Sequence, residues 1–597
     1  MDKHLAKKDR MLHFQVHRHR GIFALVSLCI ALMVTLNYRE PALTASPPVF
    51  SARISDMTFT TADQMLAANE MFLSSGPFVL AKPEYRRFTT PVIGESYLDS
   101  RTLLGTLVAS SGMGVHILWG PAFDSRSTGV ADPASRQQVL MEMMMKFAQM
   151  TGATPPANPW PVFLEFEAGN PHFAQAPVSD SDHDFATLRW AHMVKLLSPA
   201  ALGQTLFKQA LWAEDFFSGS RKTSEGQTLM GTDPDAGFSG FVLTAEALNK
   251  LMSLQTDLAY DAATGTLGSI DPASYDPAQR LQYYPHQIAL AEAPVASSEY
   301  PLKPYFIVSD ISSDLYDQWS LLWGLSEFYW FANPTKKTDS PQMDANFRAI
   351  FDGSIFPREA AGLAQGLSLV VYKNLKAMHF DPEAGVFVDR WSPSGRERSV
   401  SAFNAGYVLV ALANLEAQKL MTPQGVLDPS SDIRRQADFI VAKLIDPRGG
   451  AYDGYILGRG PDSSPKTLLA QTALIRGLLA AFAATGEPRY KAAALTLANT
   501  LIERFYDPAF RGFATTLGEA VYSYTPQNLA VTLGALRELA LIGEITEASR
   551  LYTELFQTVV DGQGHEGSAM FMGAAKGNSA FASVLAGEID FSGATGR

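Results

Sequence analysis

Apolar residues recur at helical spacing through the second half of the chain. From residue 238 onward, segments of about 13 to 21 residues carry apolar side chains at i, i+3, i+4 and i+7, which predicts helices. The predicted helices are Phe241–Leu258, Asp314–Phe331, Ala360–Met378, Ala402–Leu420, Asp432–Leu444, Lys466–Ala483, Tyr490–Phe505, Gln527–Ile542 and Glu547–Val560. Tight and longer connections alternate between them, so the pattern predicts a repeated helical pair.

Four of the longer connections share one motif: Asp, a Gly-containing turn, and then an aromatic or apolar residue. The Asp residues are Asp261, Asp381, Asp446 and Asp507, and the last three lie 65 and 61 residues apart (446−381 and 507−446). A fixed period of this size indicates a repeat architecture. Asp before a turn and Gly within it favour a short β-hairpin, so we expect these carboxylates to be structural.

The tight connections contain Gly486 and Gly543, which predict helix ends followed by a restart. The unit is therefore helix, tight turn, helix, hairpin. Such pairs bury their apolar faces by stacking side by side, either as a closed ring or as an open solenoid. We expect a ring, an all-α toroid (barrel) of helical hairpins with short β-hairpin loops at one end, where functional loops would gather.

The chain resembles a known group of proteins in this repeat pattern. Phe505–Pro508 with Gly512–Phe513, and Leu468–Gln471 at the start of the preceding inner helix, resemble the (α/α)6-toroid superfamily of six-hairpin glycosidases and N-acylglucosamine 2-epimerase-like proteins. The resemblance covers about residues 240–597. Epimerase-like relatives use paired histidines, and His286 and His379 do not recreate that pattern, so epimerase activity is not implied.

The N-terminus predicts export. Residues 1–20 form a basic tail, and residues 21–38 are apolar, which indicates an uncleaved transmembrane anchor or, alternatively, a signal peptide. The basic flank would stay in the cytoplasm, so we expect a single-pass protein of the bacterial inner membrane with its bulk in the periplasm. Residues 39–60 are predicted as a linker, 61–237 as a mostly helical region that includes a helix over Phe185–Leu197, and 238–597 as the toroid repeats.

Charge and cysteine content narrow the chemistry. The net charge of −12 argues against a nucleic-acid partner. The only cysteine, Cys29, lies in the apolar N-terminal segment, so the exported part has no disulfide and no thiolate nucleophile. The histidines show no metal-ligand spacing, so we predict neither a metal nor another cofactor.

Carboxylates and aromatic residues follow the hairpins, where each next helix begins. These residues are Asp314, Asp317, Trp319, Asp389, Arg390, Trp391, Asp453, Tyr455, Glu519, Tyr522 and Tyr524. Aromatic faces stack on sugars, and glycosidic hydrolysis needs one protonated and one ionised carboxyl group. We predict Asp453 as the acid, and Asp314, Asp317 and Asp389 as ionised carboxylates, because helix starts and Arg390 favour negative charge. Trp319, nearest the hairpin end, is the predicted sugar platform, with Arg390, Trp391, Tyr455, Glu519, Tyr522 and Tyr524 also binding substrate.

These patterns predict a membrane-anchored periplasmic glycoside hydrolase that acts on an envelope or exported polysaccharide. One alternative is a noncatalytic polysaccharide-binding or scaffold component of an envelope protein complex. A polysaccharide lyase is a third, although the acidic chain argues against a polyanionic substrate.

Overall fold

The computed structural model describes most of the second half of the chain and parts of the first. It covers residues 50–56, 58–74, 142, 145–152, 166–173, 188–217, 220–231, 234–291, 305–333, 335, 350–560, 571–572 and 584–593. The predicted anchor at residues 21–38 lies outside these residues.

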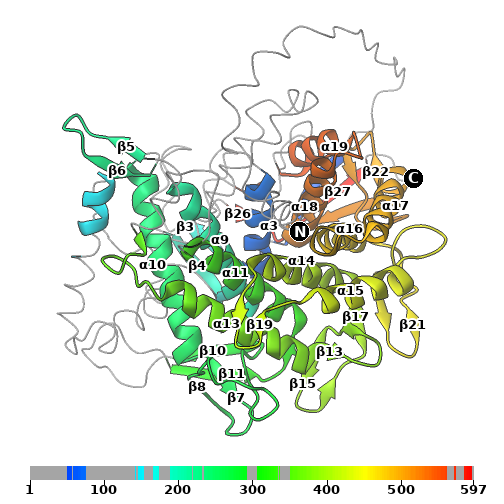
Figure 1. Cartoon of the computed structure of the whole chain (residues 1–597). Helices are drawn as coiled ribbons and strands as arrows, with labels where there is room; N and C mark the ends of the chain where they lie inside the picture. The colour runs from blue at the N-terminus through cyan, green and yellow to red at the C-terminus, as the bar shows by residue number, and fades with distance from the viewer. Residues whose placement is uncertain are drawn as a thin grey trace, which may run out of the picture.

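Six helices of the described chain form a closed ring. They are α3 (Thr61–Ser74), α9 (Pro199–Phe216), α11 (Leu315–Ala332), α14 (Ala402–Gln418), α16 (Leu468–Thr485) and α18 (Pro526–Ile542). Each packs against the next in this order, and α18 packs against α3, so the first and last helices lie side by side (Figure 1). This closed contact order confirms the ring and excludes an open solenoid.

Outer helices pack against the ring. They are α10 (Pro234–Thr256), α13 (Ala360–Asn374), α15 (Ser430–Phe439), α17 (Pro488–Arg504) and α19 (Ala548–Leu555). Three of them end in a π-helical turn, at Leu375–His379, Ile440–Leu444 and Phe556–Val560. Nearly every residue of α11 is buried, whereas α17 buries one face, as expected of inner and outer helices.

Local sequence explains where the inner helices begin and end. The side chains of Ser401 and Thr467 accept a hydrogen bond from the backbone N–H three residues on, and Thr525 forms a capping box with Asn528. Gly486 and Gly543 end α16 and α18 with φ of 71° and 73°, a conformation that glycine adopts without strain.

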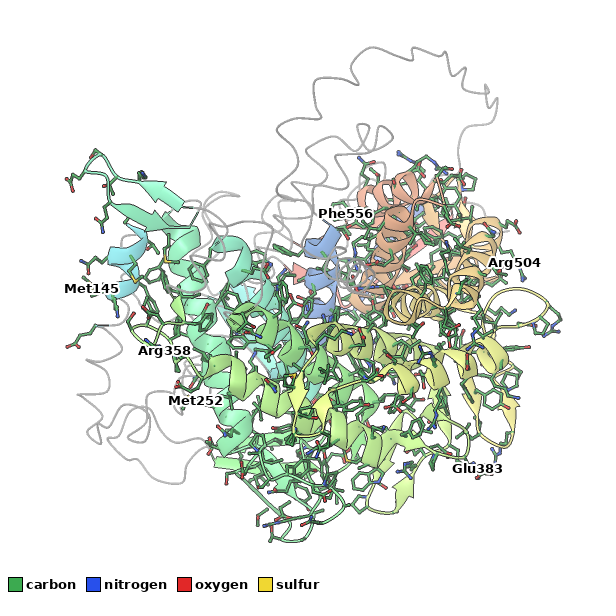
Figure 2. All side chains as sticks on the ribbon, viewed as in Figure 1. Met145, Met252, Arg358, Glu383, Arg504 and Phe556 are labelled. Atoms are coloured by element: carbon green, nitrogen blue, oxygen red, sulfur yellow. The ribbon has the colours of Figure 1, made fainter. Side chains whose placement is uncertain are left out.

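The predicted hairpins are confirmed and connect outer helices to inner ones. The Asp motifs form β7 (Ala259–Asp261) with β8 (Thr266–Gly268), β13 (Phe380–Asp381) with β14 (Val386–Phe387), a bridge between Ile445 and Ala451, and β22 (Tyr506–Asp507) with β23 (Gly512–Phe513). In each, the Asp carboxylate accepts a hydrogen bond from the backbone N–H two residues on. Figure 2 shows Glu383 at the edge of the molecule, where β13 turns into β14. These Asp residues are therefore turn formers, as predicted.

Further strands surround the starts of the inner helices. They are β2 (Phe59–Thr60), β3 (Phe166–Phe173), β4 (Leu188–Leu197), β5 (Ser220–Lys222), β6 (Thr228–Met230), β9 (Gln282–Tyr283), β10 (Gln287–Ala291), β11 (Tyr305–Asp310), β12 (Ser313–Asp314), β15 (Arg390–Ser392), β16 (Gly395–Arg396), β17 (Ser399–Ser401), β18 (Met421–Thr422), β19 (Gly425–Val426), β20 (Gly454–Ile456), β21 (Gly460–Pro461), β24 (Val521–Tyr524), β25 (Phe571–Met572) and β26 (Val584–Leu585). The largest sheet has the order β11-β10-β4-β3-β2. β1 (Phe50–Asp56) and β24 flank β27 (Glu588–Gly593), so both ends of the described chain meet where α3 joins α18.

Two sequence predictions need correction. The segment Phe185–Leu197, predicted as a helix, contains β4, whose backbone pairs with β3 and β10. Two inner helices, α3 and α9, come from residues 61–237, which we predicted to lie apart from the toroid repeats. Neither is preceded by the Asp-turn motif, so the repeat signal in the sequence starts after the ring has already begun.

Among the described helices, one is long and apolar enough to cross a membrane, Leu468–Thr485. It is α16, and 83% of it is buried inside the protein, as expected for a wall of the ring.

Close backbone contact between α14 and α16 leads to a stability prediction. A Cβ on Gly406 would lie against the carbonyl of Ala473, far inside van der Waals distance. Gly406→Ala should therefore lower the free energy of unfolding by about 1–3 kcal/mol in urea titrations. The matched control is Gly362→Ala, because a Cβ added to that α13 glycine would meet nothing within 4 Å, and alanine there should stabilise the helix by about 0.5–1 kcal/mol. Equal effects would contradict the close packing.

A buried ion network links four inner helices. Arg537 donates to the carboxylate of Glu70 and lies 3.0 Å from Glu538. Arg476 bridges the same two carboxylates at 3.5 and 3.2 Å, and the Tyr407 hydroxyl donates to Glu70 at 3.0 Å. Burial alone would raise the pKa of Glu70, but the two guanidinium charges outweigh it and hold this pKa below its usual value. Two positive and two negative charges balance inside the ring.

Candidate functional site at the start of the inner helices

Contacts between first turns show that the inner helices begin at one end of the ring. The carboxylate of Asp317 in α11 accepts from the backbone N–H of Ala200 in α9 at 3.0 Å. The Trp319 Nε1 donates to Asn404 in α14 at 3.0 Å. The Tyr316 hydroxyl in α11 donates to Asp63 in α3 at 2.9 Å. We call this end, where the hairpins also lie, the ring mouth.

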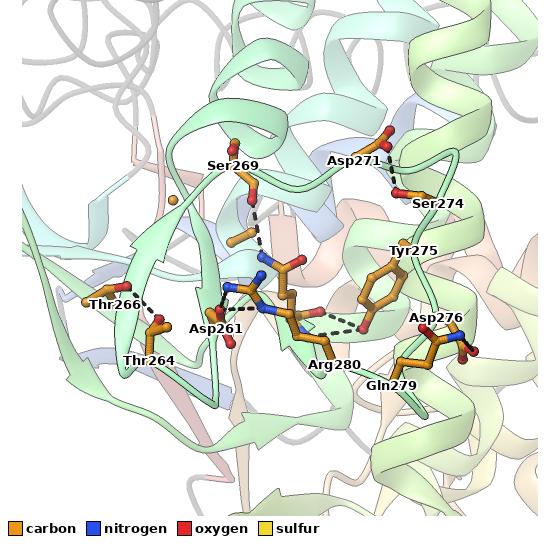
Figure 3. Close-up of a pocket in the computed structure, with 13 residues that line it drawn as sticks. Asp261, Thr264, Thr266, Ser269, Asp271, Ser274, Tyr275, Asp276, Gln279 and Arg280 are labelled. Atoms are coloured by element: carbon orange, nitrogen blue, oxygen red, sulfur yellow. Dashed lines mark hydrogen bonds and ion pairs between the residues drawn. The ribbon is translucent and has the colours of Figure 1, made fainter.

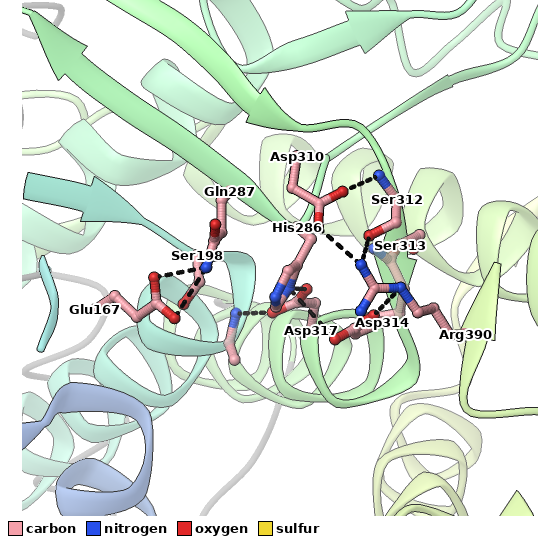
Figure 4. Close-up of polar contacts among 12 residues, drawn as sticks. Glu167, Ser198, His286, Gln287, Asp310, Ser312, Ser313, Asp314, Asp317 and Arg390 are labelled. Atoms are coloured by element: carbon pink, nitrogen blue, oxygen red, sulfur yellow. Dashed lines mark hydrogen bonds and ion pairs between the residues drawn. The ribbon is translucent and has the colours of Figure 1, made fainter. Parts of the chain in front are cut away.

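One polar cluster surrounds the first turn of α11 (Figure 4). His286 Nδ1 lies 2.7 Å from Asp317 Oδ2 and 3.5 Å from Asp314 Oδ2. Arg390 Nε lies 3.5 Å from Asp314 Oδ1, and the same guanidinium bonds Asp310 at 2.8 Å. Asp314 and Arg390 are also cross-strand partners in β12 and β15. The structure thus brings together three residues that the sequence predicted, and adds His286 and Asp310.

Burial and charge compete in this cluster. Burial opposes protonation of His286, but the hydrogen bond and charge of Asp317, with Asp314 and Asp310 nearby, outweigh it and raise the pKa of His286 to about 9. Burial also raises the pKa of Asp317 to about 6, against the opposing effect of His286. The helix start therefore does not hold this pKa at its usual value, although it remains below neutral pH and Asp317 is mostly ionised there. At neutral pH the two groups form a buried ion pair.

His286→Gln should change how stability depends on pH. A His whose pKa is raised from 6.5 to about 9 stabilises the fold fully below pH 6.5, and this contribution disappears as pH rises through about 9. Urea titrations between pH 6.5 and 9.5 should show the wild type losing its advantage over the variant across that window. His379→Gln is the control, because burial lowers the pKa of His379 to about 4, so this variant should not alter the pH dependence of stability above about pH 7.5, whatever its effect on stability itself. A constant advantage of wild type over His286→Gln would contradict the ion pair.

The same cluster has the composition of a metal site. Ligand atoms of His286, Asp314 and Asp317 all lie within 4.8 Å of one another. However, the His286 Nδ1 is already bonded to Asp317, and Arg390 supplies a second positive charge beside Asp314. The ion pairs account for the cluster, so we assign no metal to it.

A second group lies where three inner helices meet. Asp63 Oδ1 accepts from the Tyr316 hydroxyl at 2.9 Å and from the Gln527 side-chain amide at 3.2 Å. Its other oxygen, Oδ2, accepts no hydrogen bond from the described residues. Burial raises the pKa of Asp63 to about 6, more than the two hydrogen bonds lower it. A carboxyl group with a pKa near 6 is half protonated at pH 6 and about one-tenth protonated at pH 7, so it can donate a proton under mildly acidic to neutral conditions.

A chain of contacts connects Asp63 with Asp389 across the mouth. Tyr316 stacks on Trp319 with ring centroids 4.9 Å apart, and Trp319 donates to Asn404. The Asn404 side-chain amide in turn donates to Asp389 Oδ1 at 3.0 Å. Since α3 and α14 occupy opposite positions in the six-helix ring, the two carboxyl groups lie on opposite sides of the mouth.

Asp389 and Asp453 occupy equivalent positions in successive repeats. The Asp389 carboxylate accepts a hydrogen bond from the backbone N–H of Ser401, and the Asp453 carboxylate accepts one from the backbone N–H of Thr467. Each bond holds the residue that caps the next inner helix. Burial raises the pKa of both carboxyl groups. A role in starting the helices therefore accounts for both side chains, whatever chemistry they also perform.

The predicted aromatic platform needs correction. Trp319 and Tyr524 are fully buried, so neither presents a face to a ligand. Both have a hydrogen-bond acceptor inside the protein, and the Tyr524 hydroxyl donates to the carbonyl of Phe513. Large aromatic side chains on this inner helix complete the core. The spacing of Trp319, Trp323 and Trp330 along the sequence, on one helical face, is also typical of core residues.

The remaining predicted residues are dispersed around the rim. Trp391 packs edge-to-face on Tyr283 at 5.3 Å, and Tyr455 packs on Phe439 at 5.4 Å. Tyr522 donates to the turn residue Asp507 at 2.9 Å, and Glu519 is exposed in the turn before β24. These residues do not form one cluster.

Asp63 was not predicted from the sequence. It is the third residue of α3, the position that Asp317 occupies in α11, Asn404 in α14 and Asn528 in α18. The signal was therefore present, but it could be used only after Thr61–Ser74 had been recognised as a ring helix.

Comparisons with known proteins add structural likenesses only. No family model matches the sequence, and no curated protein matches it. Among solved structures, the cellobiose 2-epimerase of Spirochaeta thermophila is 12% identical with a TM-score of 0.41, over 91% of this chain and 99% of that one. A D-mannose isomerase is 12% identical with a TM-score of 0.41, over 75% and 92%. The GH76 α-mannanase of Bacteroides thetaiotaomicron is 12% identical with a TM-score of 0.34, over 60% and 73%. At these scores they carry no argument about this protein, and the closed ring of six inner helices follows from the helix contacts of this chain.

Proposed function

We propose that this protein is a carbohydrate-active enzyme that hydrolyses glycosidic bonds at the ring mouth. The observation that carries the proposal is Asp63, a partly buried carboxyl group with a raised pKa, bonded through one oxygen and positioned by two other inner helices. Glycoside hydrolysis requires such a group to protonate the leaving oxygen.

We propose Asp389 as the second carboxyl group. Burial raises the pKa of Asp389, and three donors, the Ser401 N–H and hydroxyl and the Asn404 amide, offset part of this rise and favour its ionised form. An ionised carboxylate opposite the acid would act on the far face of the sugar, either as a base toward water or as a nucleophile. Asp63 thus replaces Asp453 as our proposed acid, while Asp389 keeps the role that the sequence predicted.

The test is product release by the full chain from manno-, xylo-, cello- and envelope-derived oligosaccharides. We expect new reducing ends from at least one of them, and their loss in Asp63→Asn. Product formation that persists in Asp63→Asn would overturn the assignment of the acid, and absence of product from every substrate would count against hydrolysis.

A noncatalytic polysaccharide-binding protein is the second candidate. Asp389 and Asp453 are each engaged at a helix start, as expected if their purpose is structural. Saturable binding of an oligosaccharide from the same set, without any new reducing end, would favour this candidate.

The N-terminal sequence supports a proposed location. We propose that residues 21–38 anchor the chain in the inner membrane and that the ring faces the periplasm, near envelope polysaccharides and any partner complex. Protease accessibility of the ring in spheroplasts, compared with intact cells, tests this orientation.

A further inference from the structure

Two neighbouring cavities lie on the flank of the ring and share no lining residue with the Asp63 group. The first is a polar pocket of about 520 Å³ between hairpin β7–β8 and the loop that leads to β9 (Figure 3). Its lining consists mainly of hydroxyl, amide and carboxyl side chains, including Thr266, Ser269, Gln279 and Gln282. Convergent groups of this kind suit the hydroxyls of a sugar.

The walls of this polar pocket are held by their own bonds. Arg280 forms an ion pair with Asp261 across the pocket, which neutralises that carboxylate. The Tyr275 hydroxyl donates to the carbonyl of Gln282 at 2.8 Å, and Asp271 accepts from the Ser274 hydroxyl at 2.6 Å. A pre-formed wall lowers the entropic cost of binding a ligand.

The second cavity is an apolar groove of about 1440 Å³ between α10, α13 and hairpin β18–β19. Its lining includes Leu248, Met252, Leu363, Leu369 and Val426, and Val426 is 53% exposed. Figure 2 shows Met252 on this flank. The volume exceeds the roughly 300–1,000 Å³ of ordinary small-molecule sites, so the groove has room for a long chain.

The two cavities adjoin. Asp271 lines both of them, and the next two residues, Pro272 and Ala273, line the groove. Lys373 lines the groove, and its ammonium donates to the carbonyl of Tyr275, which lines the polar pocket, at 2.6 Å. A polar cavity and an apolar one therefore share a wall.

We propose that this flank binds a single glycolipid molecule, with its sugar headgroup in the polar pocket and its hydrocarbon chain in the groove. A sugar alone would leave the apolar groove exposed to water, and a hydrocarbon alone would make no use of the pocket's polar groups. One amphiphile matches both cavities, and its binding does not depend on hydrolysis at the ring mouth.

Photo-labelling of the full chain in lipid nanodiscs tests this site. The probes are decyl glycosides with a diazirine on the alkyl chain and a maltosyl or N-acetylglucosaminyl headgroup, used below micelle formation. We expect labelled peptides from α10, α13 or β18–β19, identified by mass spectrometry. The unlabelled parent glycoside should compete at least tenfold better than decanol or the free sugar, because each retains only one half of the contacts. Each methylene added to the competitor should improve competition by about threefold to fourfold.

Variants separate a specific site from nonspecific apolar labelling. Val426→Lys in the groove and the pair Ser269→Ala and Thr266→Val in the pocket should each reduce labelling at least fivefold. Val521→Lys is the matched control, because Val521 is 40% exposed on β24 and does not line either cavity. The proposal would be overturned if decanol competed as effectively as the glycoside, or if labelling spread over the surface as it does for a bilayer contact. It would also be overturned if both sets of variants kept their labelling, or if neither probe labelled the protein.

Discussion

Asp63→Asn is expected to reduce glycoside hydrolysis by about 10²- to 10⁴-fold, the usual contribution of a general acid. The asparagine has the same size as the aspartate, and its side-chain oxygen can still accept the hydrogen bonds from Tyr316 and Gln527. It has no acidic proton to donate. The rate of the wild type should fall as pH rises through about 6, because the pKa of Asp63 is raised to that value and only its protonated form is active. The measurement is kcat/KM against pH on the substrate found by product release, and the alkaline limb should be absent from Asp63→Asn.

Two further variants distinguish an acid from a structural carboxylate. Tyr316→Phe removes a hydrogen bond that lowers the pKa of Asp63, so the alkaline limb of the profile should move to higher pH. Asp56→Asn makes the same chemical change at an exposed residue at the end of β1, whose carboxylate accepts a hydrogen bond from the backbone N–H of Thr58, and should leave the rate unchanged. An unchanged pH profile in Tyr316→Phe would contradict the role of Asp63.

Arg537→Met is expected to lower the free energy of unfolding by about 3–5 kcal/mol, the largest stability effect that we predict. It leaves Glu70 fully buried with one guanidinium, Arg476, shared between Glu70 and Glu538. An uncompensated charge in the interior is costly because protein surroundings replace the lost water poorly. Urea titration at neutral pH measures the effect, and the fall should diminish at low pH as the carboxyl groups become protonated.

The surface pair of Lys491 and Glu544 supplies the control. Both side chains are partly exposed, so Lys491→Met should change stability by less than about 1 kcal/mol. The double variant Arg537→Met with Glu70→Leu should recover part of the loss, because it removes charges of both signs. Similar losses in Arg537→Met and Lys491→Met would show that the interior network contributes no more than a surface pair.

Local rules predicted the repeated elements well. Asp381, Asp446 and Asp507 form the expected turns because a carboxylate beside a Gly-containing turn finds its partner within a few residues. Gly486 and Gly543 end helices for a similarly local reason. These signals are strongest after residue 238, and so the predicted start of the toroid was too late in the chain.

The candidate site depended on contacts that local rules do not describe. Trp319 looked like a sugar platform because it is near a helix start, yet ring closure buries it among Tyr316, Phe403 and Tyr407. Asp63 gained its raised pKa only from packing between α3, α11 and α18, which are separated along the chain by 194 residues or more (526−332 for the nearest pair).

The sequence by itself determined the helical repeat, its turns and the end of each pair at which carboxylates gather, since periodicity and turn chemistry act over a few residues. Only the tertiary structure decided which helices complete the ring, which carboxyl groups are ion-paired or capping, and which one has its pKa raised to about 6 between three inner helices. Burial and charge pairing set those properties, and both depend on neighbours that folding brings together from distant parts of the chain.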